Sequence, residues 1–397
     1  MDISERMLFY VVDWLPPDFG AVGQYGVNFA RELAHVGRHV CLVGLTSGSL
    51  HRSKCHVGSG TLAMVLLPTA SYNKTRLVGR FLWTLRANAR LFWEVVRRRQ
   101  SYKADLLFTG APPFFLYFAV LAKFLRHVRL IYRITDFYPE VIIAEIGRPS
   151  MLLRLLQGVT WSLRRRVDRF EVLGFDQRQR LIEGGIPAGR IAIKRDTSPV
   201  VITGREPPAP RPPELAGRKV LLYSGNYGVP HEVETVIGGF TRHYREGSGR
   251  VGLWLNAAGR GADRVETSLR DAGVAVARGA TVPLDRLPAL LSAADAHLVT
   301  LRPEFSGIVL PSKIYACIAS RRPIVFVGPP SSDVHRLSID ALQSTYVHIN
   351  PGDVPGFAAA LERLAEGTSG ERRDRHDKRA ACAESVSAAV PGLRAST

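Results

Sequence analysis

The stretch LRPEFSGIVLPSKIYACIASRRPIVFVGP, Leu301–Pro329, carries the most specific pattern in the chain. It follows the apolar run AHLVTL (Ala296–Leu301) and ends in a second apolar run, PIVFVG (Pro323–Gly328). Between the two runs lies Pro311–Lys313, and proline is favoured at the first position of a helix. The pattern therefore predicts a strand, a helix and a second strand, which is the repeating unit of a parallel α/β sheet.

The same alternation extends from this stretch through both halves of the 397-residue chain. The segment REPPAPRPPELAG, Arg205–Gly217, holds five prolines in 13 residues and predicts a linker. We expect an N-terminal domain over 1–204, a C-terminal domain over 218–370, and a final helix or tail over 371–397 that packs back on the first domain. The predicted strands are 7–12, 39–45, 104–110, 128–134, 169–174, 219–225, 251–259, 296–301 and 323–328.

Near-continuous apolar strands that alternate with helices indicate two Rossmann-like domains of the α/β class. In such domains, ligands bind at the carboxyl ends of the strands, so we expect a cleft between the two domains. The four cysteines are widely spaced and show no CxxC pattern, which suits a reducing compartment. The N-terminus predicts a strand and no signal peptide. The longest apolar stretch, 111–122, is shorter than a membrane span of about 20 residues.

The net charge of +18 is unevenly distributed. Residues 1–200 hold 29 Lys and Arg against 15 Asp and Glu, a net of +14, which leaves +4 for the rest. The segment 76–100 predicts a helix with seven arginines and one acid, Glu94. Such a helix, with Trp83 and Trp93, can lie on an anionic membrane, with 112–125 adding to the docking face. The alternatives are a surface helix whose apolar face is core, and a buried start of a helix at 112–125.

Two segments of the second half predict a binding site for an anion. In 221–240, Gly225 and Gly228 bracket Asn226 at a strand end, where backbone N–H groups are available to a phosphate, and His231 adds a polar or cationic contact. In the opening stretch, Arg302 ends a strand, and Ser312 and Lys313 begin a helix whose N-terminus favours negative charge. Each residue has a structural alternative, such as a capping serine or a solvated lysine.

Two segments of the first half predict contacts on the other side of the cleft. Gly20, Gly23 and Gly26 follow the first strand and allow the backbone to approach a ligand, although their spacing does not match GxGxxG. Asp136 and Glu140 follow the strand 128–134 and are candidates for hydroxyl contact or proton removal. The alternative is that Asp136 caps a helix. In a further polar segment, 194–200, Arg195 and Ser198 are placed to face the cleft.

Motifs for other chemistries are missing from the sequence. It contains no DxD, HExxH, GxSxG or P-loop pattern. We therefore expect neither a metal ion nor another cofactor.

The chain resembles retaining glycosyltransferases of the GT-B fold, in the large group 1 (family 4) class. The resemblance covers almost the whole chain and is strongest to a subgroup that builds bacterial surface polysaccharides such as O-antigen, capsule and exopolysaccharide. Its markers are LPPDFGAVGQY near the start, TDFYPE, RDTSPV, LYSGN and the opening stretch.

The resemblance implies that the N-terminal domain binds the acceptor and the C-terminal domain binds a nucleotide sugar. It places Gly225, Asn226, Ser312 and Lys313 at the donor diphosphate and Gly20–Gly23 beside the reacting sugar. It also implies that the departing diphosphate accepts the proton of the acceptor, and that helices from Gly356 onward cross back to the first domain. The chain departs from many relatives at Ala316, where they have a glutamate for the ribose. It departs also at Asn226, where they have an arginine, and near His231, where they have a lysine.

The expected function is transfer of a hexosyl or N-acetylhexosaminyl group, with retention, from a UDP-type donor to a lipid-linked saccharide. Catalysis is assigned to Asp136, Asn226 and Lys313. Expected partners are the nucleotide sugar, a polyprenyl-diphosphate-linked acceptor and an anionic membrane at the cytoplasmic face, with no nucleic acid. The alternatives are an inactive binding protein of the same fold and a sugar-nucleotide epimerase.

Overall fold

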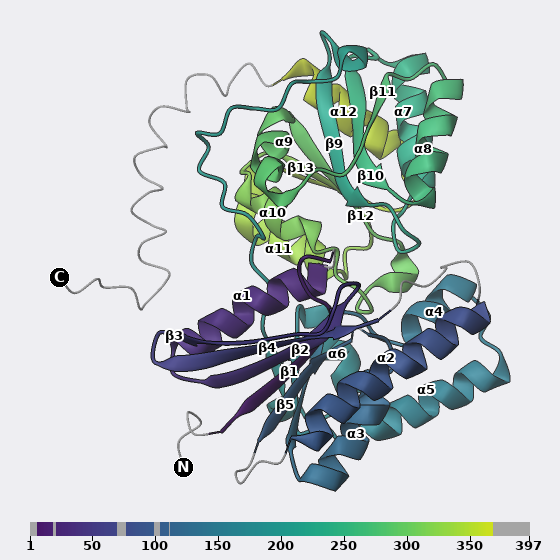
Figure 1. The fold of residues 1–397 in the computed structure, drawn as a ribbon. Helices are drawn as coiled ribbons and strands as arrows, with labels where there is room; N and C mark the ends of the chain where they lie inside the picture. The colour runs from purple at the N-terminus through teal and green to yellow at the C-terminus, as the bar shows by residue number, and fades with distance from the viewer. Residues whose placement is uncertain (1–5, 19–20, 70–76, 99–103, 111, 368–397) are drawn as a thin grey trace.

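The computed structural model describes residues 6–18, 21–69, 77–98, 104–110 and 112–367. Within these residues the structure forms two α/β domains, drawn one above the other in Figure 1. Each is built on a sheet whose strands are largely buried.

The first sheet has the strand order β3-β4-β2-β1-β5-β6-β7-β8. Every neighbouring pair is parallel except β3 and β4, which form an antiparallel hairpin at one edge. The strands are β1 (Leu8–Trp14), β2 (His39–Thr46), β3 (His51–Val57), β4 (Gly60–Pro68), β5 (Asp105–Thr109), β6 (Arg129–Ile134), β7 (Arg169–Val172) and β8 (Ile191–Ile193). The helices are α1 (Ala21–His35), α2 (Leu77–Arg97), α3 (Phe115–Arg126), α4 (Glu140–Ile146), α5 (Met151–Arg164) and α6 (Phe175–Glu183).

Side chains alternate across β1 and so bury both faces of this sheet. Leu8, Tyr10 and Val12 pack with α1 on one face. Phe9 and Val11 pack with α2 and α3 on the other. One prediction needs correction here: α1 begins at Ala21, so Gly23 and Gly26 belong to the helix and not to a loop before it.

The second sheet has the order β11-β10-β9-β12-β13-β14, and all its neighbouring strands are parallel. The strands are β9 (Lys219–Asn226), β10 (Val251–Ala258), β11 (Val276–Gly279), β12 (Ala296–Thr300), β13 (Ile324–Val327) and β14 (Tyr346–Ile349). The helices are α7 (Glu234–Glu246), α8 (Arg260–Asp271), α9 (Leu287–Ala293), α10 (Lys313–Ala319), α11 (Asp333–Leu342) and α12 (Val354–Glu366).

Helix α12 packs on α7 within the C-terminal domain, where Phe357 lies against Phe240. The expectation that helices from Gly356 onward cross back to the first domain is therefore not met by α12 (Figure 1). The tail 371–397 lies outside the described residues. The linker 205–217 packs against the C-terminal domain, since Ala209 N–H bonds to the Ala289 carbonyl and Arg211 pairs with Asp295.

The opening stretch joins the two domains. Phe305, Ile308 and Leu310 belong to the same buried apolar cluster as Phe137 and Phe170 of the first domain. Backbone bonds reinforce the contact, since the N–H of Phe137 donates to the carbonyl of Ile308 at 3.1 Å. The stretch Leu301–Pro329 thus also forms the junction between the two domains.

Candidate functional site

The carboxyl end of β9 turns sharply beneath the side chain of Lys313. Gly225 has φ +109°, a conformation that favours glycine. A Cβ atom placed on it would lie 4.0 Å from Cε of Lys313. The bare backbone of Gly225 therefore faces the side chain of Lys313, the first residue of α10.

Lys313 has an unusual environment for a lysine. Its Nζ atom lies 3.4 Å from the centre of the Tyr223 ring and is buried, with no hydrogen-bond partner among the described residues. Burial lowers its pKa to about 7, against a small opposing effect of the Cys317 thiol. An ammonium group held on a ring face without a counter-ion is a site that an anionic ligand would complete.

His231 lies beside this lysine but does not act as a cation. Its Nδ1 atom lies 2.8 Å from the carbonyl oxygen of Thr300, and its ring meets Tyr223 and Tyr227 edge-on. Burial, followed by the charge of Lys313, lowers its pKa to about 3. Of the two contacts considered from the sequence, polar or cationic, the structure therefore supports the polar one at neutral pH.

The other residues expected to bind the donor, Ser312, Arg302 and Asn226, have different environments. Ser312 occupies the N-cap position of α10, yet its side chain makes no capping bond, which removes the capping alternative. Arg302 is half-buried, with Nη1 3.4 Å from the Val229 carbonyl and Nε 3.5 Å from Glu304. Asn226 is exposed at the end of β9, and Tyr223 donates a hydrogen bond to its carbonyl at 3.0 Å.

The departure at Ala316 has a packing explanation. Ala316 is buried in an apolar cluster with Leu222, Ala293 and Trp254. A glutamate at this position would place a charge among apolar groups unless the backbone shifted.

On the first domain, Asp136 lies directly at the junction. Its backbone forms a bridge with Val309 of the opening stretch. Helix α4 begins at Glu140 with Pro139 in the N-cap position, so Asp136 is not the helix cap. Burial, followed by the nearby charge of Asp13, raises the pKa of Asp136 to about 6. A partly buried carboxyl group with a raised pKa, at the junction of the two domains, is suited to hydroxyl contact.

Glu140 does not lie with Asp136 as the sequence suggested. Its two oxygens accept bonds of 2.5 and 2.9 Å from Arg164 of α5, and both side chains are almost fully buried. This pairing gives Glu140 a structural role. We therefore correct the prediction that Glu140 contacts the acceptor. Arg195 and Ser198 are likewise occupied, the first by Asp333 of α11 and the second by the carbonyl of Val200.

The glycine-rich segment is described in part. Gly20 lies outside the described residues. Gly23 lies so close to Trp14 that a Cβ atom would be 1.7 Å from the Trp14 carbonyl oxygen. Position 23 therefore requires a glycine, because any side chain there would collide with the end of β1. The Trp14 ring stacks on Trp83 of α2, with 5.8 Å between ring centres.

Several site residues were missed from the sequence. Tyr223, Tyr227 and Thr300 enclose Lys313 and His231, and the two tyrosine rings stack 4.0 Å apart. Asp13 is the counterpart of Asp136 at the end of β1, and burial raises its pKa to about 6. Asp13 directly follows the predicted strand 7–12, and this position could have identified it as a site residue. Nothing in the sequence around the two tyrosines distinguishes them from residues of the core.

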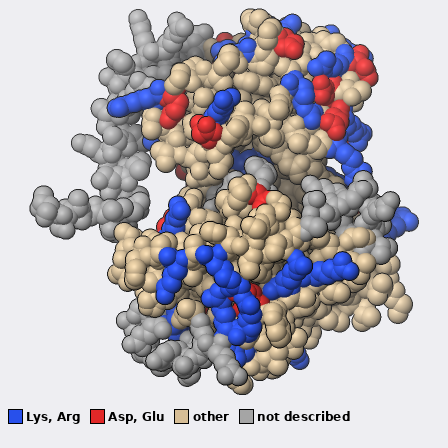
Figure 2. Space-filling view, in the orientation of Figure 1, with Lys and Arg blue, Asp and Glu red and all other residues tan. Residues whose placement is uncertain are grey.

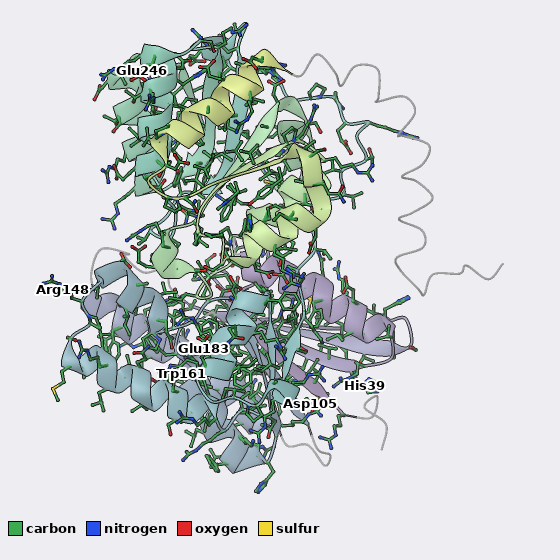
Figure 3. All side chains as sticks on the ribbon, turned by 180° about the vertical axis from the view of Figure 1, so that it is seen from behind. His39, Asp105, Arg148, Trp161, Glu183 and Glu246 are labelled. Atoms are coloured by element: carbon green, nitrogen blue, oxygen red, sulfur yellow. The ribbon has the colours of Figure 1, made fainter. Side chains whose placement is uncertain are left out.

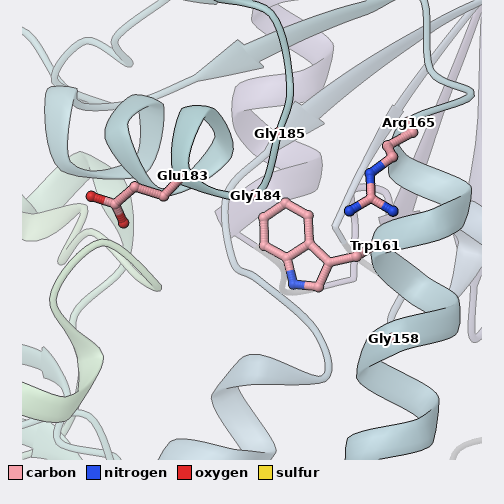
Figure 4. Close-up of a pocket in the computed structure, with 6 residues that line it drawn as sticks. All are labelled: Gly158, Trp161, Arg165, Glu183, Gly184 and Gly185. Atoms are coloured by element: carbon pink, nitrogen blue, oxygen red, sulfur yellow. The ribbon is translucent and has the colours of Figure 1, made fainter.

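Two surface hollows lie away from this site. One, of about 470 Å³, lies between α5 and α6 and is lined by Trp161, Arg165 and Gly184 among others (Figure 4). The other, of about 430 Å³, lies between α2 and the β3–β4 hairpin. Within the described residues, no group of three or more His, Cys, Asp or Glu side chains is placed to hold a metal ion.

Comparison with known proteins supports the fold. No family model matches the sequence. The chain is 24% identical over 306 residues, 74% of each chain, to a probable glycosyltransferase, WbjE, of Pseudomonas aeruginosa. It superimposes on sucrose-phosphate synthase of Thermosynechococcus elongatus with a TM-score of 0.64 at 13% identity, covering 97% of this chain and 100% of that one. The E. coli trehalose-6-phosphate protein bound with UDP-2-fluoro glucose gives 0.62 at 15% identity, covering 96% and 95%. The predicted fold class, two Rossmann-like domains in the GT-B arrangement, is confirmed.

Proposed function

We propose that this protein is a retaining glycosyltransferase that uses a nucleotide diphosphate-sugar, with UDP as the nucleotide. The observation that carries the proposal is the buried ammonium group of Lys313, which lies above Tyr223, faces the glycine turn at Gly225 and has no hydrogen-bond partner among the described residues. A diphosphate would supply the missing counter-charge. The similarity to WbjE, and a neighbour of the same fold solved with a UDP sugar analogue, support this assignment.

The proposed reaction needs positive charge more than a strong base. The bond from the sugar C1 to the diphosphate breaks, a bond from C1 to the acceptor oxygen forms, and the acceptor proton passes to the released diphosphate. Lys313, the Ser312 hydroxyl and the backbone at Gly225 would stabilise the charge that develops on the leaving group. Asn226 and His231 would add neutral polar contacts, and Arg302 a second charge near the same strand ends. Asp136 would orient the acceptor hydroxyl from the opposite side of the cleft.

We propose further that the acceptor is a saccharide linked to a polyprenyl diphosphate, as in surface polysaccharide synthesis. The protein would then work at the inner face of the cell membrane. The outward side of α2 supports this, because Phe81, Leu85 and Trp93 are exposed by 65%, 47% and 63%. Its inward side, with Ala87, Leu91 and Val95, is core, and the proposed membrane contact concerns the outward side alone. Among the described residues, none of the helices combines the length and apolar character that crossing a bilayer requires.

Neighbouring helices extend this outward apolar surface. Met151, Leu152 and Leu155 form an exposed stripe on α5, and Phe124 is exposed on α3, which packs against α5. At the end of α4, Arg148 points away from the body of the protein (Figure 3). In the view of Figure 2, Lys and Arg side chains gather on the N-terminal domain with few acids among them. Exposed apolar side chains with a basic surround are typical of membrane-surface proteins.

The activity is tested by incubating the protein with a panel of nucleotide sugars and a polyprenyl-diphosphate saccharide in detergent. We expect release of the nucleotide from one donor, and thermal stabilisation by the same donor. Lys313→Ala should lower kcat by about 10²-fold, the usual effect of removing one contact to a developing charge. Unchanged turnover in that variant would remove Lys313 from the mechanism. Lys219→Ala, which changes a lysine that pairs with Asp295, is the matched control.

A further inference from the structure

A groove between α2 and the β3–β4 hairpin has no role in the proposed reaction. It has a volume of about 430 Å³, and its walls include the apolar side chains of Leu50, Leu67 and Trp93. Arg52, Arg90 and Arg97 line the same groove. Apolar walls and three guanidinium groups in one hollow fit a ligand that has both a hydrocarbon part and a negative charge.

Among the described residues, the positive charges at the groove outnumber the negative ones. Glu94 is the acid in the lining, and it is 3% exposed. Arg52 engages it with two bonds of 2.8 and 3.1 Å, Arg98 approaches it to 2.9 Å, and Arg97 pairs with it as well. Three guanidinium groups against one carboxylate leave an excess of two positive charges, and Arg90 beside Pro68 adds a third.

Glu94 acts as the fixed anchor of this cluster. Burial alone would raise its pKa, but the bonds from Arg52 and Arg98 hold the pKa below its ordinary value. The carboxylate therefore remains ionised and holds Arg52 and Arg98 in place. Arg97 remains 41% exposed, so its guanidinium is accessible at the groove. Arginine is the side chain best suited to a phosphate, because its planar group donates two parallel hydrogen bonds.

The groove also lies on the outward surface that carries exposed apolar side chains. Trp93 is exposed by 63% on the same helix, α2, that carries the exposed Phe81 and Leu85. Tryptophan and arginine at such a surface are typical of the level at which lipid headgroups meet the hydrocarbon. A purely structural role explains the Arg52–Glu94 pair, the Arg97–Glu94 pair and the bond from Arg90 to the Pro68 carbonyl. It does not explain the excess of positive charge or the exposed indole of Trp93.

We propose that this groove binds the phosphate of an anionic phospholipid, with Arg90 and Arg97 on the headgroup and Trp93 and Leu67 along the first part of the chains. The proposal rests on the membrane-surface part of the proposed function and makes it specific. The groove would fix α2 on the bilayer. Because Trp83 of α2 stacks on Trp14 at the end of β1, it would also hold the acceptor side of the cleft near the lipid.

The test compares the wild-type protein with Arg90→Gln/Arg97→Gln, and with the control Arg242→Gln/Arg264→Gln, whose exposed arginines lie on the second domain. Three probes are used: phosphatidylcholine vesicles with and without phosphatidylglycerol, short-chain phosphatidylglycerol below its micelle concentration, and inorganic phosphate. We expect the groove variant to lose about thirtyfold in affinity for phosphatidylglycerol vesicles, since two arginines contribute about 1 kcal/mol each. The control variant should bind as the wild type does.

A second readout reports on the groove itself. Short-chain phosphatidylglycerol should shift the tryptophan emission of the wild type to the blue, and Trp93→Phe should abolish that shift. Equal vesicle binding by the groove variant and the wild type would overturn the proposal. So would inorganic phosphate binding as tightly as the short-chain lipid, because the groove would then be a site for free phosphate.

Donor turnover measured in detergent distinguishes a failure of the groove proposal from a failure of the proposed glycosyltransferase activity. The groove variant should release nucleotide at the wild-type rate, because neither arginine belongs to the site around Lys313. If no variant turns over any donor while the lipid results hold, the proposed activity fails and the lipid site stands. If turnover is normal and the lipid results fail, the groove proposal fails alone.

Discussion

The side-chain nitrogen of Lys313 lies 3.4 Å from the centre of the Tyr223 ring. Burial lowers the pKa of this lysine to about 7. A bound diphosphate favours the protonated form and raises the pKa again. Donor binding should therefore be independent of pH below about 7 and weaken above it, because the lysine must first take up a proton.

This dependence is measurable by calorimetry in buffers of different ionisation enthalpy. The dissociation constant for the donor should rise by up to about tenfold for each pH unit above 7, with uptake of up to one proton. Lys313→Arg supplies the control, since arginine stays charged throughout this range. If the wild type binds equally well at pH 6 and pH 9 without proton uptake, Lys313 does not contact the anionic part of the donor.

The same lysine should lower the stability of the protein at neutral pH. An unfolded lysine has a pKa of about 10.4, whereas the folded protein holds it at about 7. Folding therefore releases a proton between these values, and the free energy of unfolding rises with pH across this interval. Lys313→Met removes this penalty. We expect it to stabilise the protein on the order of 2–4 kcal/mol at pH 7 and to abolish donor binding.

Urea unfolding at pH 7 and pH 10 checks this prediction. The advantage of Lys313→Met over the wild type should shrink at pH 10, because the wild type loses most of the penalty there and the methionine variant carries none at either pH. Lys219→Met, at a lysine that is 43% exposed, should show no such dependence on pH. A methionine variant that is less stable than the wild type at pH 7 contradicts the argument.

Much of this site could be anticipated from the sequence, because strand ends and helix starts have local signals. The sequence predicted a helix that begins at Ser312 and Lys313, from the apolar run before Arg302 and from Pro311. The structure has α10 begin at Lys313, in agreement with that prediction. The tertiary environment of Lys313 could not be predicted, because Tyr223 and His231 reach it from 90 and 82 positions earlier in the chain. Nothing in the local pattern distinguishes a tyrosine that faces a lysine from one that fills the core.

The missed strands have a similar explanation. β8 and β14 are short edge strands, and their hydrogen bonds, not their own apolar content, define them. The β3–β4 hairpin was signalled by Gly58 and Gly60 between two runs, but β3 is almost entirely exposed and lacks an apolar alternation. Glu140 was misassigned because its partner, Arg164, lies in a different helix.

Asp136 should control the acid side of the pH profile. Burial, with the added effect of Asp13, raises its pKa to about 6. If the ionised carboxylate orients the acceptor, kcat/KM for the acceptor rises with pH through about 6 and then levels off. Asp13→Asn removes the neighbouring carboxyl and should shift this rise to lower pH. Asp136→Asn should remove the rise and lower kcat/KM.

The measurement is kcat/KM for the acceptor from pH 5 to pH 8 in each variant. Glu304→Gln is the control, because this exposed carboxylate also lies in the opening stretch. Identical profiles for the wild type and Asp136→Asn would exclude Asp136 from acceptor binding, whatever their absolute rates.

Asp333 at the start of α11 should be required for the joint between the domains. It is almost fully buried, accepts a bond from the N–H of Phe175 at 3.1 Å, and pairs with Arg195. Asp333→Ala leaves these donors without an acceptor and should destabilise the protein by about 3 kcal/mol. Chemical unfolding followed by circular dichroism measures the loss. Asp353→Ala, which removes a cap on α12 far from the joint, should cost only about 1 kcal/mol.

Two glycines near the α5–α6 hollow should respond in opposite directions to the same substitution. A Cβ atom on Gly184 would lie 2.0 Å from the Trp161 ring (Figure 4). The guanidinium of Arg164 lies over the same ring, 4.5 Å from its centre. Gly158, in the middle of α5, has no atom within 4 Å of the same position. Gly184→Ala should therefore destabilise the protein by about 1–3 kcal/mol through overpacking. Gly158→Ala should stabilise it by about 0.5–1 kcal/mol, because alanine loses less freedom in a helix.

Thermal unfolding of the two variants beside the wild type gives both signs in one experiment. A stabilised Gly184→Ala would mean that the Trp161 ring can move away, and that the packing between α5 and α6 is looser than the contact distances imply.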